Sequence, residues 1–139
     1  MKDIHVKTLT TYFDDGKSGK KNFEICKNDK NYEVGDRLHS HAWLIGEDGI
    51  GGYAIKVPNF LLGASAWLMG VGEKEFTAEQ AASYTKDITE VETHESLTKY
   101  GYHNWLSSAG IDADYVFKVL NDIFNCDRVP EGYVLIKTE

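Results

Sequence analysis

The stretch that decides the fold is Lys21-Asn22-Phe23-Glu24-Ile25-Cys26-Lys27. Its apolar residues Phe23 and Ile25 alternate with more polar ones, which is the period of a strand with one buried face. A strand is therefore predicted over residues 21–27. Because successive side chains of a strand point to opposite faces, Glu24 and Cys26 are expected to share the face opposite Phe23 and Ile25.

Extended segments also surround this stretch. The other strands predicted in the first half of the chain cover residues 4–9, 37–45 and 53–57. After the first of them, a short helix over residues 10–15 is expected to end at Gly16 and the Ser18-Gly19 pair. The beginning of the chain is thus predicted to be mostly β.

The pattern becomes helical after Pro58. Residues 59–72 are ambiguous between a pair of strands and a buried loop. Helices are then predicted over residues 77–88, 93–108 and 112–124. The first rests on a capping box between Thr77 and Gln80, and the last has the clearest apolar stripe, with Asp112 as its N-cap.

Residues 133–137 are a run of β-formers, and a single late strand must pair with something. Its available partners are the early strands. Residues 60–128 are therefore interpreted as a mostly helical insertion before the last strand, within a single domain that spans residues 1–139. The predicted class is α+β.

Composition supports a packed globule. The chain has 139 residues, with 42% hydrophobic residues and only 2 prolines, which fits one domain. No apolar run is long enough for a transmembrane helix, and residues 1–5 lack the apolar core of a signal peptide. We therefore expect no membrane partner and a cytoplasmic location. Cys26 and Cys126 are expected to be free thiols.

The net charge of −7 is unevenly distributed. Residues 1–60 carry nine basic and nine acidic side chains, whereas residues 61–139 carry six and thirteen. A nucleic-acid surface is usually basic, so it would have to come from the first half. The acidic stretch 73–95 is typical of a solvated face, and it could also meet a basic protein partner.

Three positions carry a resemblance to a known family. Gly19, Lys21 and Glu24 match the signature GxKxxExR, and Cys26 stands where the Arg is expected. With neighbouring residues of segments 3–57 and 131–137, they resemble the ASCH domains of the PUA-like superfamily. The similarity is greatest to small ASCH-like domains of unknown function found in phages and their bacterial hosts.

This resemblance implies a PUA-like mixed β-barrel of about five or six strands, with a cleft that binds RNA or a nucleotide. Its central contacts would be Lys21 and Glu24. Charge support is expected from Lys20, Lys27 and Arg37, while Cys26 replaces a bidentate anion ligand by a small thiol. No cofactor, metal ligand or catalytic residue is assigned.

Two enzymatic alternatives stay open. Some ASCH proteins resemble amidohydrolases of a modified nucleoside, acetylated cytidine, which use a Lys followed directly by a Thr. Here Asn22 follows Lys21, and an amide has no hydroxyl to act as nucleophile. Cys26 could instead serve as a nucleophile if His39 or His41 acted as its base.

Two further patterns admit a functional interpretation. His39 and His41 share one strand face and could chelate a metal, but they lack a third ligand and have Arg37 beside them. The tryptophans Trp43, Trp67 and Trp105 could stack on bases, although packing in the core is the commoner role. A protein-interaction adaptor that uses the acidic insertion remains the third alternative function.

Overall fold

The computed structural model describes residues 1–59, 64–70 and 72–139. In these residues the chain forms seven strands and four α-helices, which confirms the α+β class. The strands are β1 (Asp3–Leu9), β2 (Phe23–Lys27), β3 (Arg37–Ile45), β4 (Gly51–Asn59), β5 (Ala64–Met69), β6 (Ser83–Glu92) and β7 (Tyr133–Thr138). The helices are α1 (Thr10–Ser18), α2 (His94–Tyr100), α3 (Tyr102–Ser108) and α4 (Ala113–Phe124), with a short 3-10 helix η1 (Gly72–Lys74). No described helix has the length and hydropathy needed to cross a membrane.

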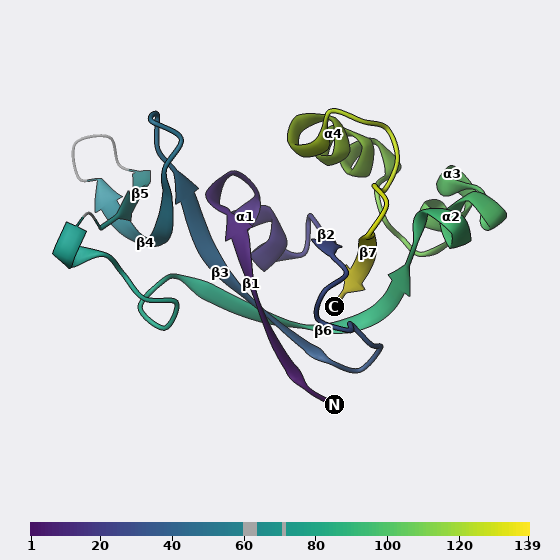
Figure 1. Cartoon of the computed structure of the whole chain (residues 1–139), viewed down its shortest axis with the longest axis horizontal. Helices are drawn as coiled ribbons and strands as arrows, with labels where there is room; N and C mark the ends of the chain where they lie inside the picture. Colours follow the sequence, from purple (N-terminus) through teal and green to yellow (C-terminus); the bar gives the residue numbers. More distant parts are fainter. Residues whose placement is uncertain (60–63, 71) are drawn as a thin grey trace.

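β3 is the central strand of one curved sheet. It pairs in parallel with β1 along one side, from Asp3 opposite Arg37 to Leu9 opposite Trp43. Its other side pairs first with β6 and then, beyond His41, with β4. The sheet continues from β6 through β7 to β2, all antiparallel, and the β4–β5 hairpin extends it at the opposite end (Figure 1).

The expected barrel is not closed. The order β1-β3-β6-β7-β2 leaves β1 and β2 as two edges, and no pairing joins them among the described residues. A groove between these edges is lined by residues of both strands. The sheet is therefore an open, curved sheet with a groove along its unclosed side.

The two faces of β2 and β7 bury different cores. Phe23 and Leu135 pack with the helices α3 and α4, whereas Val134 and Ile136 pack with Ile4 on the inner, concave side. Cys26 joins the inner cluster, and the Glu24 carboxylate lies 3.5 Å from the phenol of Tyr84. The expected alternation of β2 is confirmed.

The helix predicted over residues 77–88 is wrong, because residues 83–92 form β6. The capping box itself is present: the Gln80 amide oxygen accepts from the Thr77 N–H at 2.9 Å, and the Thr77 hydroxyl accepts from the Gln80 N–H at 3.3 Å. It closes a single turn, after which β-branched and aromatic residues pair with β3. The expectation that residues 60–128 are mostly helical fails for β5 and β6.

Other boundaries also differ from the sequence prediction. The helix predicted over 93–108 is two helices, divided at Gly101, whose φ of 84° is unsuited to a helix interior. α1 runs on through Gly16 and ends at Gly19, which has a left-handed conformation. In the ambiguous stretch 59–72, β5 pairs with β4, while residues 60–63 and 71 lie outside the described residues.

Candidate functional site

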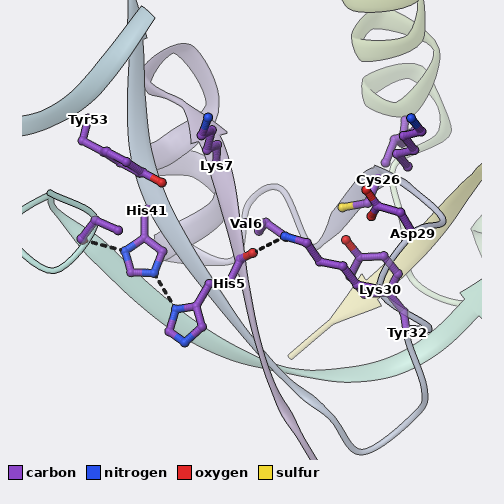
Figure 2. A pocket seen from close by; sticks show the side chains of 12 residues that line it. His5, Val6, Lys7, Cys26, Asp29, Lys30, Tyr32, His41 and Tyr53 are labelled. Atoms are coloured by element: carbon purple, nitrogen blue, oxygen red, sulfur yellow. Dashed lines mark hydrogen bonds between the residues drawn. The ribbon is translucent and has the colours of Figure 1, made fainter.

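The groove between β1 and β2 has a volume of about 450 Å³. Three lysines, Lys7, Lys27 and Lys30, line it together with one carboxylate, Asp29. Figure 2 shows Lys7 on one side of the groove and Asp29 and Lys30 on the other. All three lysines are exposed. The groove is thus locally basic in a chain whose net charge is −7.

Lys30 bridges the two walls of the groove. It follows β2 in a turn, and its ammonium donates to the backbone oxygen of His5 on β1 at 2.6 Å (Figure 2). The next residue, Asn31, has a φ of 49°, a left-handed conformation that Asn tolerates better than most residues. Beyond it the buried ring of Tyr32 packs in the inner core and anchors the turn.

Three imidazoles are stacked beside the groove, and two of them, those of His5 and His41, line it. The His5 ring lies 4.6 Å from that of His39 and 5.1 Å from that of His41, measured between centroids. His41 donates through Nδ1 to the Ala78 carbonyl oxygen at 2.9 Å, and His39 bonds Asp3 and Thr85. Since Nε2 of His41 also lies 2.8 Å from Nδ1 of His5, both ring nitrogens of His39 and of His41 are engaged within the protein. In the part of the chain described, no cluster of three or more metal-ligating side chains occurs.

The thiol of Cys26 is poorly suited to nucleophilic attack. Burial, reinforced by the negative charge of Glu24, raises the pKa of Cys26 to about 12. A thiol attacks as the thiolate, so its reactivity at neutral pH is low. This weighs against the Cys26 mechanism considered from the sequence.

Lys21 and Glu24 line a separate cavity of about 80 Å³, which shares Lys7 and Ile25 with the groove. The Lys21 ammonium lies 3.1 Å from a Glu24 oxygen and donates to the Phe23 carbonyl at 2.9 Å. Its side chain is only 4% exposed, so the two residues form a buried ion pair rather than a surface pair. The buried Thr8 hydroxyl also lines this cavity and has no hydrogen-bond partner among the described residues.

The remaining residues expected from the sequence are dispersed. Cys26 and Lys27 line the groove, whereas Lys20 and Arg37 are exposed outside the groove lining. Asn22, which stands where the amidohydrolases have Thr, donates its side-chain amide to the Gly110 carbonyl at 3.1 Å. Of the six expected ligand residues, two therefore line the groove, Cys26 and Lys27, and two line the smaller cavity beside it, Lys21 and Glu24.

Residues 4–58 match the model of a domain of unknown function, DUF3850. This DUF3850 segment is less than half of the chain, and no curated protein matches the chain. The groove lining from His5 to Tyr53 lies inside the segment, and Ala78 adds to it from outside. The matched segment therefore supplies nearly all of the groove.

Sequence reasoning missed Lys7, Tyr32 and Tyr53 as groove residues. The alternation of the predicted strand 4–9 did indicate that Lys7 is exposed. Ile4 and Val6 lie on the face of this strand that is buried or half-buried, and Lys7 lies on the opposite face. What the sequence does not reveal is the parallel pairing that sets Lys7 opposite His41. The three tryptophans have different surroundings. Trp67 packs edge-on to Phe13, and Trp105 packs against the helical core. The Lys7 ammonium lies over the ring of Trp43.

Proposed function

We propose that the groove between β1 and β2 binds RNA or a nucleotide and that the chain acts as a binding module. The observation that carries this proposal is the gathering of Lys7, Lys27 and Lys30 on one groove. Lysine ammonium groups attract phosphates, and association with nucleic acid is driven largely by such contacts. The acidic excess of the second half restricts this attraction to one surface.

In this proposal the other residues expected from the sequence have supporting roles. Lys21 and Glu24 fix the start of β2 through their buried ion pair and reach a ligand only through the small cavity. Cys26 forms part of the groove wall. Lys20 and Arg37 add positive charge at longer range.

We also propose that the chain is a divergent ASCH-like domain of the PUA-like superfamily. The support is the signature match at Gly19, Lys21 and Glu24, together with a curved sheet in the order β1-β3-β6-β7-β2. In this interpretation the sheet is a barrel left open on one side, and the open side is the ligand cleft.

The test is a titration with fluorescein-labelled single-stranded RNA of about ten nucleotides at several salt concentrations. If about three phosphates are neutralised, the slope of log affinity against log salt is near −2. Lys7→Ala and Lys27→Ala should each weaken binding several-fold and make that slope shallower.

Lys99→Ala is the matched control, because Lys99 is exposed on α2 and does not line the groove. Its affinity and salt slope should equal those of the unmodified protein. The proposal is contradicted if neither groove substitution changes RNA affinity. It is also contradicted if the protein binds neither RNA nor nucleotides at low salt.

A further inference from the structure

A second cavity of about 470 Å³ continues the groove. The two cavities share Lys7 and Tyr53. Beyond these residues the second cavity is lined by apolar and aromatic side chains, Trp43, Ile50, Met69 and Phe76. Together the two cavities form a path from the lysines at β2 to the hairpin between β3 and β4.

The charge of this path changes along its length. The charged residues that line the second cavity are two carboxylates, Asp48 and Glu75, and one lysine, Lys7, which lies at the junction with the groove. Two carboxylates repel a phosphate, but they accept hydrogen bonds from amino groups. One Asp48 oxygen accepts from the Ile50 N–H at 3.0 Å, which holds the carboxylate on the hairpin at the cavity wall.

Trp43 is held in place at the junction. Its ring meets Tyr53 edge-to-face, with centroids 5.0 Å apart and an interplanar angle of 87°. The indole crosses the backbone of Gly51, and a side chain there would collide with it. The Lys7 ammonium lies 3.9 Å from the centre of the indole ring.

We propose that the second cavity is a subsite for a nucleobase that carries an exocyclic amino group. This inference rests on the proposed function, and it adds an orientation and a base preference. The phosphate lies toward Lys7, Lys27 and Lys30, and the base enters beside Trp43 and Tyr53. The amino group donates to the carboxylates of Asp48 and Glu75, as amino groups of bases do to acidic side chains.

Lys7 links the two halves of the path. Its ammonium rests on the Trp43 ring, and its long side chain allows it to turn toward a phosphate in the groove. A charge-assisted hydrogen bond to phosphate is stronger than an exposed cation–π contact. Phosphate binding therefore draws Lys7 away from the indole and opens the ring face on which a base stacks.

The test compares nucleotide pairs in which a carbonyl replaces the exocyclic amino group and the neighbouring ring nitrogen gains a hydrogen: CMP against UMP, and AMP against IMP. Affinities are measured by calorimetry, with pyrophosphate as a probe that has no base. CMP and AMP should bind about tenfold tighter than their partners, which corresponds to roughly 1.4 kcal/mol. The double substitution Asp48→Asn and Glu75→Gln should abolish this preference without weakening pyrophosphate binding.

Glu47→Gln is the matched control, because it removes a charge from the same turn at an exposed position outside the cavity lining. It should keep the preference. Gly51→Ala should displace the indole and weaken all four nucleotides while sparing pyrophosphate. If all four bind equally and the double substitution changes nothing, the subsite is refuted and the proposed function survives. If the nucleotides, pyrophosphate and the labelled RNA all fail to bind, both are refuted.

Discussion

Nδ1 of His5 and Nε2 of His41 lie 2.8 Å apart and share a hydrogen bond across the paired strands β1 and β3. Neutral His41 carries its ring hydrogen on Nδ1, which donates to the Ala78 carbonyl oxygen, so its Nε2 accepts from His5. A proton added to Nε2 of His41 removes this acceptor. The two hydrogen bonds of His41 therefore favour its neutral form.

The first prediction concerns pH and stability. Burial lowers the pKa of His41 from its ordinary value of 6.5, and the neighbouring His5 and His39 add to this effect while Ala78 and Glu79 oppose it. The unfolded chain therefore binds more protons than the folded chain below about pH 6.5, so stability falls as pH is lowered. Urea denaturation between about pH 7.5 and 5 should show this decline.

His41→Gln should flatten the decline, since the amide can still bond Ala78 but does not titrate in this range. A variant with the same pH dependence as the unmodified protein would locate the titrating group elsewhere. Thr85→Val, which removes a hydrogen bond to His39 without touching His41, should leave the dependence unchanged.

The second prediction concerns the reactivity of Cys26. With a pKa of about 12, only on the order of one in ten thousand of these thiols is ionised at pH 8. Iodoacetamide should therefore alkylate Cys26 of the folded protein at least about a hundred times more slowly than it alkylates glutathione. Mass spectrometry of the labelled peptides gives the rate of alkylation. Unfolding in guanidinium should raise this rate to that of an ordinary exposed thiol. Fast labelling of the folded protein would contradict this prediction and would support Cys26 as a nucleophile.

The third prediction concerns the buried pair of Lys21 and Glu24. Lys21→Met leaves the Glu24 carboxylate buried beside the Tyr84 phenol without its cation. Removing one partner of a buried ion pair costs about 3 kcal/mol or more of the free energy of unfolding. Adding Glu24→Gln removes the stranded charge, so the double variant should be more stable than Lys21→Met alone. Additive losses in this cycle, measured by denaturation, would mean that the two side chains are not coupled.

The fourth prediction concerns Gly16 in α1. A Gly-to-Ala change inside a helix normally stabilises it by about 1 kcal/mol. Here the new methyl group collides with the Tyr84 phenol oxygen, and overpacking costs about 1 to 3 kcal/mol. Gly16→Ala should therefore lower the melting temperature. Adding Tyr84→Phe should recover part of the loss, and a stabilising Gly16→Ala would show that α1 does not pack on Tyr84.

Elements with a strong period were predictable. The alternation of Phe23 and Ile25 located β2, and the apolar stripe after Asp112 located α4, because one buried face dictates each pattern. The final strand was predicted over residues 133–137 and is observed over Tyr133–Thr138. Its pairing with the early strand β2 is also confirmed.

β6 was not predictable from local sequence. Ala81, Ala82, Thr85 and Ile88 satisfy helical spacing, and Thr77 makes a real capping box with Gln80. The extended conformation follows from pairing with β3 and β7, which is tertiary information. Where local propensity is weak, such long-range pairing decides the outcome.

The candidate site was predictable only along β2. Lys27 and Cys26 came from one strand whose motif is continuous in sequence. Lys7 and Tyr53 reach the same groove from β1 and β4, and nothing in the sequence specifies that these strands meet around β3. A groove assembled by non-local pairing has no contiguous signature.

Two lysines that bond backbone oxygens of the edge strands β1 and β2 also affect how the protein behaves at high concentration. Lys21 occupies the Phe23 carbonyl on β2, and Lys30 occupies the His5 carbonyl on β1. An unpaired strand edge is a template on which a second molecule can add its own strand, and lysines on such edges oppose that addition. We therefore expect these side chains to protect the open sheet from edge-to-edge aggregation, so that the groove stays accessible to ligand.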